Sequence, residues 1–207
     1  MDSNKLNICT VTLGTDAKIV NENLIEFNKL YNDVKLYIVC PKEDVDTFKE
    51  SLIEKNYEII TEDELIEFKD FKNIFEELSK DLEYKEEFGN RLQWYYALFL
   101  KFFFIHRFFE NNGSKIVIWE GDSVILKKIQ FFKNDSSLLY VWVHYYHDIF
   151  YKTCKEMLGS LPKYYGSFIT MFGSLTNDEF DYLNKSLGFN KLNNKEFCAA
   201  FSKKALN

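Results

Sequence analysis

The chain has 207 residues, of which 46% are hydrophobic, 28% charged and 18% aromatic, enough for one domain with a substantial buried core. Its 8 glycines and 2 prolines are too few for a linker-rich, fibrous or disordered protein. The net charge of −6 argues against general binding to duplex nucleic acid, so no nucleic-acid partner is expected.

The charge is spread unevenly along the chain. Residues 43–87 contain 17 of the 32 acidic residues and only six lysines. The remainder holds 15 acids against 20 lysines and arginines, so it is mildly basic. Such a remainder could bind an anionic ligand although the whole chain is acidic.

The first part of the chain alternates predicted strands and helices. Short runs rich in β-branched residues predict strands over 7–13, 34–40 and 57–60. Between them, helical spacing of apolar residues predicts helices over 17–31 and 43–54. A β-α-β-α-β order favours an α/β fold in which helices flank a mostly parallel sheet.

The middle of the chain predicts one buried helix and one central strand. Residues 62–88 are acidic with helical spacing and are interpreted as a solvent-covered helical insert. Residues 90–109 are apolar nearly all round, which is typical of a buried helix. Residues 115–119 (KIVIW) predict a strand, residues 120–123 break it, and residues 124–126 are expected to resume extended structure.

Four further elements are predicted beyond residue 137. The patterns indicate strands over 138–143 and 167–172 and helices over 147–158 and 177–187, the last with Asn177 as its N-cap. Residues 190–207 are interpreted as a short C-terminal tail. No internal repeat or composition break is present, so residues 1–207 are predicted to form a single domain.

Two carboxylates, Glu120 and Asp122, flank Gly121 directly after the predicted central strand. Ligands of α/β sheets commonly bind at the carboxyl ends of strands. Two such carboxylates could hold one Mn²⁺ or Mg²⁺ ion, which would neutralise a diphosphate leaving group. A plain β-turn with two solvated acids explains the same spacing.

A second group of candidate residues lies on the preceding helix. Arg91, Trp94 and Lys101 fall on one broad face of it. Cations on an apolar helix require water, an acid or an anionic ligand. They could therefore contact a bound anion, or extend to solvent and pair with the acidic region.

Two further motifs are weaker indications of a functional site. His144, His147 and Asp148 do not form HExxH, and no third zinc ligand stands at a recognisable spacing. These three residues could instead contact an acceptor or act as a base. Residues 14–16 (GTD) end the first strand and could touch a nucleotide, but they form neither a Walker A nor a GxGxxG loop.

Four cysteines lie far apart without a CxxC pair, which indicates reduced thiols. The N-terminus lacks the pattern of a signal peptide, and the most apolar stretch is interrupted by charges. The sequence thus predicts a cytoplasmic protein without a transmembrane segment, and it leaves peripheral contact with a membrane open.

Three stretches together resemble GT-A-fold glycosyltransferases. They are the first strand NICTVTLG, the helix RLQWYYALFLKFFF and the DxD-like element KIVIWEGDSVIL. The last two, with the later stretches HYYHDIFYKTCKEMLG and GSFITMFGSLTNDEFDYL, are similar to a bacterial family of surface-polysaccharide glycosyltransferases. The resemblance covers about residues 7 to 187.

The resemblance implies roles for seven residues. Asp122 and Glu120 match the acids of DxD, so they would be the catalytic and metal-binding residues. Arg91 and Lys101 match basic positions near the donor's diphosphate or sugar. Thr10, Val11 and Thr12 match the strand end where the nucleotide sits.

The leading hypothesis is therefore a metal-dependent transferase that moves a sugar from a nucleotide-diphosphate sugar to a glycan or lipid-linked acceptor. Glu120 replaces the usual first Asp, and the C-terminal region that completes the acceptor side in such enzymes is short here. That short region motivates an alternative, a non-catalytic relative that binds a nucleotide sugar or a partner protein. A nucleotidyltransferase is a third class, but no triphosphate-binding loop is visible.

Overall fold

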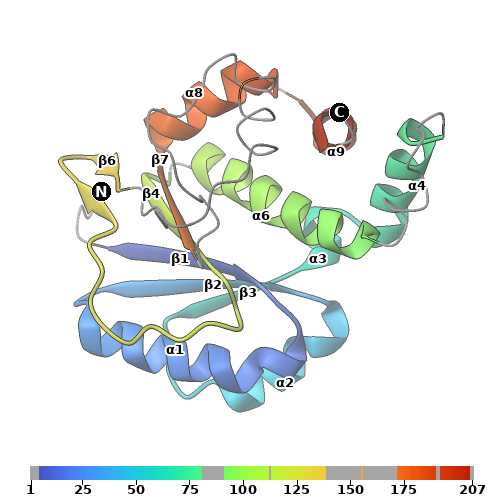
Figure 1. Cartoon of the computed structure of the whole chain (residues 1–207). Coiled ribbons are helices and arrows are strands. Elements are labelled where there is room, and N and C mark those ends of the chain that lie inside the picture. The colour runs from blue at the N-terminus through green and yellow to red at the C-terminus, as the bar shows by residue number, and fades with distance from the viewer. Residues whose placement is uncertain are drawn as a thin grey trace.

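The computed structural model describes residues 5–80, 91–111, 113–138, 155, 172–189 and 192–205. Its centre is a five-stranded sheet with helices on both faces (Figure 1). The strand order is β3-β2-β1-β4-β7, and β1 to β4 are parallel while β7 runs antiparallel to β4. The predicted α/β class with a mostly parallel sheet is confirmed.

The bounds of the elements are as follows. The sheet strands are β1 (Leu6–Val11), β2 (Val34–Cys40), β3 (Tyr57–Thr61), β4 (Lys115–Trp119) and β7 (Phe172–Thr176), and β5 (Phe132–Lys133) pairs with β6 (Ser136–Ser137). The helices are α1 (Ala17–Leu30), α2 (Val45–Ser51), α3 (Glu62–Leu65), α4 (Phe68–Leu78), α6 (Leu92–Glu110), α8 (Asn177–Leu187) and α9 (Asn194–Ala205). Two short 3-10 helices, η1 (Gly14–Asp16) and η2 (Lys42–Asp44), precede α1 and α2.

Each face of the sheet has its own core. On one face α1 buries Val20, Leu24 and Phe27 (Figure 1). On the other face α6 provides most of an aromatic cluster in which Phe99 and Phe197 are fully buried. Such burial explains why α6 is apolar on nearly every side, since it is covered by the sheet and by other helices.

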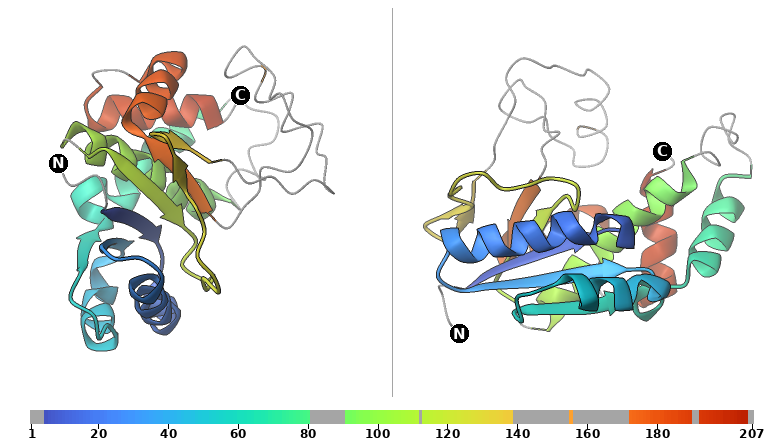
Figure 2. Two further views of the ribbon diagram at one scale, coloured as in Figure 1. Left: turned by 90° about the vertical axis from the view of Figure 1, so that its left-hand side faces the viewer. Right: turned by 90° about the horizontal axis from the view of Figure 1, so that it is seen from below.

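The topology creates a reversal between β1 and β4. After β1, the strands β2 and β3 are added on one side of it. The connection that follows β3 includes α6 and leads to β4, which lies on the opposite side of β1. Figure 2 shows the same order from two further sides. In open α/β sheets, ligands bind outside the carboxyl ends of the two strands where the order reverses.

The acidic stretch and the tail both contribute helices to the core. Phe71 and Phe75 of α4 are buried against α6, while the charged residues of α4 face outward. Residues 194–205 of the predicted tail form α9, whose Phe197 lies in the same cluster. These segments thus bury apolar side chains as well as carrying charge.

One local prediction is wrong and another is refined. Residues 124–126 are not paired into the sheet, and the Ile125 N–H donates instead to Asn23 of α1. The N-cap of α8 is Thr176 rather than Asn177: the Thr176 hydroxyl accepts the Glu179 N–H at 3.3 Å, and the Glu179 carboxylate accepts the Thr176 N–H at 2.9 Å. This reciprocal pair satisfies two donors at the start of the helix.

Several predictions lie outside the described residues. They are the strand over 138–143 apart from Leu138, the helix over 147–158 apart from Lys155, residues 167–171, and the motif of His144, His147 and Asp148. Within the described part of the chain, no helix combines the length and the apolar character needed to cross a membrane.

Candidate functional site

The candidate site lies where β1 and β4 end side by side. Thr10 and Val11 close β1, and Thr12 follows them. Glu120 to Asp122 follow β4, which pairs with β1 through Cys9 and Ile118. The structure thus brings two groups of predicted site residues, far apart in sequence, to the same edge of the sheet.

Gly121 is the point of closest approach between the two strand ends. A Cβ atom at residue 121 would lie 2.4 Å from Thr12 Oγ1 and 3.2 Å from Thr10 Oγ1. The Thr12 hydroxyl donates to Asp16 Oδ2 at 2.8 Å, whereas the buried Thr10 hydroxyl has no hydrogen-bond partner among the described residues. A glycine is required here because the turn after β4 lies directly on these threonines.

Lys101 on α6 reaches the same edge and meets Glu120. Its Nζ atom donates to both carboxylate oxygens of Glu120, each at 2.7 Å. The Lys101 side chain is only 16% exposed and that of Glu120 40%. Because partial burial reduces screening by water, this ion pair fixes the position of the first acid of the motif.

Arg91 does not join this contact. It is exposed at the N-terminal end of α6, and its separation from Lys101 by ten positions corresponds to about 15 Å along a helix axis. Of the two cations that the sequence placed near an anionic ligand, Lys101 contacts the motif and Arg91 lies farther along the helix.

A buried amide holds the loop that carries Asp122. Asn23 on α1 donates through Nδ2 to the Ser123 carbonyl, and its Oδ1 accepts the Ile125 N–H at 2.9 Å. Trp119 Nε1 donates to the same Ser123 carbonyl at 2.8 Å. The loop after β4 is therefore anchored at Ser123 and at Ile125.

The same loop is attached again near its far end. The Tyr31 hydroxyl donates to the Ile129 carbonyl at 2.7 Å and accepts the Ile129 N–H at 2.8 Å. Neither Asn23 nor Tyr31 is among the site residues predicted from the sequence. The available signal was Asn23 itself, a polar residue at a core position of α1 beside Val20 and Leu24.

Acidic side chains surround the neighbouring strand ends. The Gly14 N–H donates to Asp44 Oδ2 at 2.7 Å, which joins the loop after β1 to η2. Burial, with help from Glu43, Asp63 and Asp44, raises the pKa of Glu62 to about 7. Two carboxylates, those of Asp44 and Glu62, thus follow the ends of β2 and β3.

Glu62 gives a pH-dependent stability prediction. Because its pKa is higher in the folded protein than in the unfolded chain, the folded state binds the proton more tightly, and stability falls as pH rises from about 4.5 to about 7. Glu62→Gln removes this loss. Urea unfolding should show the variant stabilised by about 1 kcal/mol at pH 8, since solvent screens this partly exposed group, and unchanged at pH 4. Equal effects at both pH values would contradict the assignment.

The residues fit a metal ion only in part. Asp122 is exposed, and its Oδ1 accepts a bond from the Ser123 hydroxyl at 3.3 Å, so its carboxylate could join phosphate oxygens around Mg²⁺ or Mn²⁺. Glu120 is engaged on both oxygens by Lys101. Among the residues that the structure describes, no three His, Cys, Asp or Glu side chains gather to hold an ion.

Of the comparisons with known proteins, the one with solved structures found matches. No family model matches the sequence, and no curated protein sequence matches it. Among solved structures, the chain is similar to the galactosyltransferase LgtC in complex with donor and acceptor sugar analogs, with a TM-score of 0.45 and 8% identity over 94% of this chain and 70% of that chain. A likeness of this size carries no argument about activity.

Proposed function

We propose that this chain is a glycosyltransferase that uses a nucleotide-diphosphate sugar as donor and a glycan or lipid-linked molecule as acceptor. The observation that supports it is the meeting of Thr12, Gly121 and the Lys101–Glu120 pair at the reversal between β1 and β4. The sequence resemblance to GT-A enzymes points to the same edge of the sheet. The proposal includes a cytoplasmic location.

In this proposal the nucleotide lies against the end of β1, beside Thr10, Val11 and Thr12. The diphosphate lies toward the turn after β4, where Lys101 supplies a fixed positive charge. Because departure of the nucleotide leaves negative charge on the diphosphate, a cation held there stabilises the transition state more than the bound donor. Glu120 orients Lys101 through its two hydrogen bonds.

A divalent metal is part of the proposal and depends mainly on Asp122. Mn²⁺ or Mg²⁺ would act as a Lewis acid on the diphosphate oxygens. Asp122 would be the main protein ligand of this ion. Glu120 would assist only if one of its carboxylate oxygens were released by Lys101. Arg91 would contact a more distant part of the donor.

The ion pair also favours a second candidate, a non-catalytic protein that binds a nucleotide sugar. Lys101 already compensates Glu120, so a donor could bind with neither metal nor transfer. The two candidates differ in one readout. An enzyme of this class slowly releases nucleotide from its donor when metal is present, whereas a binding protein does not.

The test combines calorimetric titration of UDP- and GDP-sugars with a donor-hydrolysis assay, each with and without Mn²⁺. Asp122→Ala and Lys101→Met should each weaken donor binding by about ten- to a hundredfold, the range of a charge-assisted contact. Asp181→Ala, which removes an exposed carboxylate from α8, is the matched control and should bind as wild type. Donor affinity that is equal in all four proteins would reject the proposed site.

A further inference from the structure

The loop after β4 exposes apolar and basic side chains together. Residues 124–133 (VILKKIQFFK), which we call the basic loop, contain three lysines and no acidic residue. Leu126 is 91% exposed and Val124 39%, and Lys127 and Lys128 are exposed beside them. The loop lies beside α1 at the surface (Figures 1 and 2). A single exposed leucine is ordinary, but its position next to several lysines points to a partner that accepts both.

Leu126 is held in its exposed position. The backbone is bonded at Ser123 and Ile125 on one side of it and at Ile129 on the other, through side chains of β4, of α1 and of the C-cap residue of α1. The Ile125 side chain is 2% exposed and belongs to the core on the α1 face of the sheet. Leu126 therefore cannot turn inward unless these hydrogen bonds break.

The positive charge of the basic loop is not compensated. Within the part of the chain that the structure describes, Lys127, Lys128 and Lys133 form no ion pair with an acid. Asp135, which follows the loop, is paired with Lys115 at 2.7 Å. The neighbouring α1 carries two lysines and two glutamates, so it adds no net charge. The loop therefore presents three cations to a partner.

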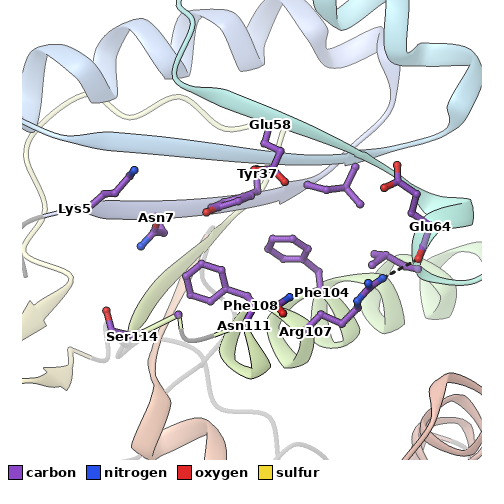
Figure 3. A pocket seen from close by; sticks show the side chains of 13 residues that line it. Lys5, Asn7, Tyr37, Glu58, Glu64, Phe104, Arg107, Phe108, Asn111 and Ser114 are labelled. Carbon is purple, nitrogen blue, oxygen red and sulfur yellow. Dashed lines mark hydrogen bonds between the residues drawn. The ribbon is translucent and has the colours of Figure 1, made fainter. Parts of the chain in front are cut away.

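A second group of surface cations differs in this respect. A hollow of about 500 Å³ lies between α6 and the strands β2 and β3 (Figure 3). Lys5 and Arg107 line it, but so do Glu58 and Glu64, and the lining thus carries no net charge. None of the exposed large hydrophobic residues of the described chain lines this hollow. Of these two surfaces, the basic loop alone combines uncompensated positive charge with exposed apolar side chains.

We propose that the basic loop docks on an anionic phospholipid bilayer. Val124 and Leu126 enter the boundary between the headgroups and the acyl chains, and the three lysines bind headgroup phosphates. Surfaces that combine apolar and basic side chains bind bilayers in this way, and an anionic leaflet attracts such cations. Because the surface is small, the contact is weak and reversible.

Two other partners suit the basic loop less well. Bases of single-stranded nucleic acid stack on open aromatic faces, whereas Val124 and Leu126 are aliphatic and Lys128 Nζ lies 5.5 Å from the centre of the Tyr31 ring. A stable protein interface buries about 800 Å² on each partner, about half of it apolar, and two aliphatic side chains supply only part of that area. A bilayer requires no such area, because lipid molecules rearrange around the side chains that insert.

Docking through the basic loop would bring the candidate site to the membrane. Asp122 lies only two positions before Val124, at the edge of the sheet where the donor is proposed to bind. A lipid-linked acceptor is held in the same bilayer, so this surface favours such an acceptor over a free glycan. That consequence rests on the proposed function, whereas membrane binding itself does not.

The test is co-sedimentation of the protein with vesicles of phosphatidylglycerol and phosphatidylcholine, and with vesicles of phosphatidylcholine alone. The protein should bind the anionic vesicles, lose affinity at high salt and bind the neutral vesicles much more weakly. Leu126→Ser should weaken binding about tenfold, as expected when one leucine side chain no longer leaves water. The double variant Lys127→Ala, Lys128→Ala should weaken it at least about tenfold.

Two control variants make the same kinds of change on the opposite face of the sheet. Tyr182→Ser removes an exposed apolar side chain from α8, and Lys69→Ala, Lys185→Ala removes two exposed lysines from α4 and α8. Both helices contribute to the core on the α6 face, so both variants should bind anionic vesicles as wild type. Circular dichroism of every variant should match wild type, because each changed side chain is exposed.

Several results would overturn the proposal. They are no binding to anionic vesicles, equal binding to neutral vesicles, an equal loss of affinity in the control variants, tighter binding of oligo(dT) than of anionic vesicles, or a wild-type dimer that Leu126→Ser converts to monomers. Titration with a UDP-sugar separates this proposal from the proposed function. Asp122→Ala should retain vesicle binding, and the variants of the basic loop should retain donor binding.

Discussion

Trp119→Ala is expected to lower the free energy of unfolding by about 3–5 kcal/mol, the usual cost of truncating a large buried aromatic side chain. Trp119 ends β4 and is 5% exposed. Its ring stacks on Phe172 at 5.5 Å between centres and meets Phe27 edge-on at 5.2 Å. The substitution therefore removes packing that joins the sheet to α1 directly below the candidate site.

Trp119→Phe separates the packing from the hydrogen bond. The smaller ring retains much of the contact with Phe27 and Phe172 but lacks the N–H that donates to the Ser123 carbonyl. Loss of one such bond costs about 1 kcal/mol, so this variant should lie much closer to wild type in urea unfolding followed by circular dichroism. A Trp119→Ala variant no less stable than Trp119→Phe would show that the ring is not part of the core.

Gly121→Ala is expected to cost about 1–3 kcal/mol in stability, because it inserts a methyl group into a packed contact. The new Cβ atom would lie 2.4 Å from Thr12 Oγ1 and 2.7 Å from Thr12 Cβ. Thr12 is buried and its hydroxyl is bonded to Asp16, so the turn rather than the threonine is expected to move. Glu120 and Asp122 would move with it, and donor affinity should fall as well.

Gly173→Ala is the matched control for this substitution. Gly173 lies in β7 on the same sheet, and a Cβ atom there meets nothing closer than Ile118 Cδ1 at 4.0 Å. In thermal unfolding, Gly173→Ala should therefore melt near the wild-type temperature, and Gly121→Ala should melt at a lower temperature. If both variants melt together, the approach of Gly121 to Thr12 is not what requires a glycine.

Much of the sheet could be predicted because its strands are short, apolar and clearly ended. Residues 34–40 and 115–119 form β2 and β4 with the predicted bounds, and α8 spans the predicted 177–187. Pro41 ends the first of these runs and the acidic turn at residues 120–122 ends the second. Such signals are local, so one sequence contains them in full.

The site was predictable only in part, since its contacts join distant parts of the chain. The resemblance to GT-A enzymes implied that Glu120, Asp122 and Thr10 to Thr12 all lie near one donor. From the sequence, either an anionic ligand or an acidic side chain could be the partner of Lys101. The packing of α6 against the sheet shows that Lys101 pairs with Glu120. The hydrogen bonds of Asn23 to Ser123 and Ile125 join residues about a hundred positions apart in sequence. No local pattern specifies such a pairing.

The most direct test of the central claim is a crystal structure of the chain with a UDP-sugar and Mn²⁺. The account predicts that the nucleotide lies against Thr10 to Thr12, with its diphosphate within hydrogen-bonding distance of Lys101 Nζ and any bound ion on Asp122. A nucleotide bound away from the ends of β1 and β4, or one bound there without contact to Lys101 or Asp122, would contradict it.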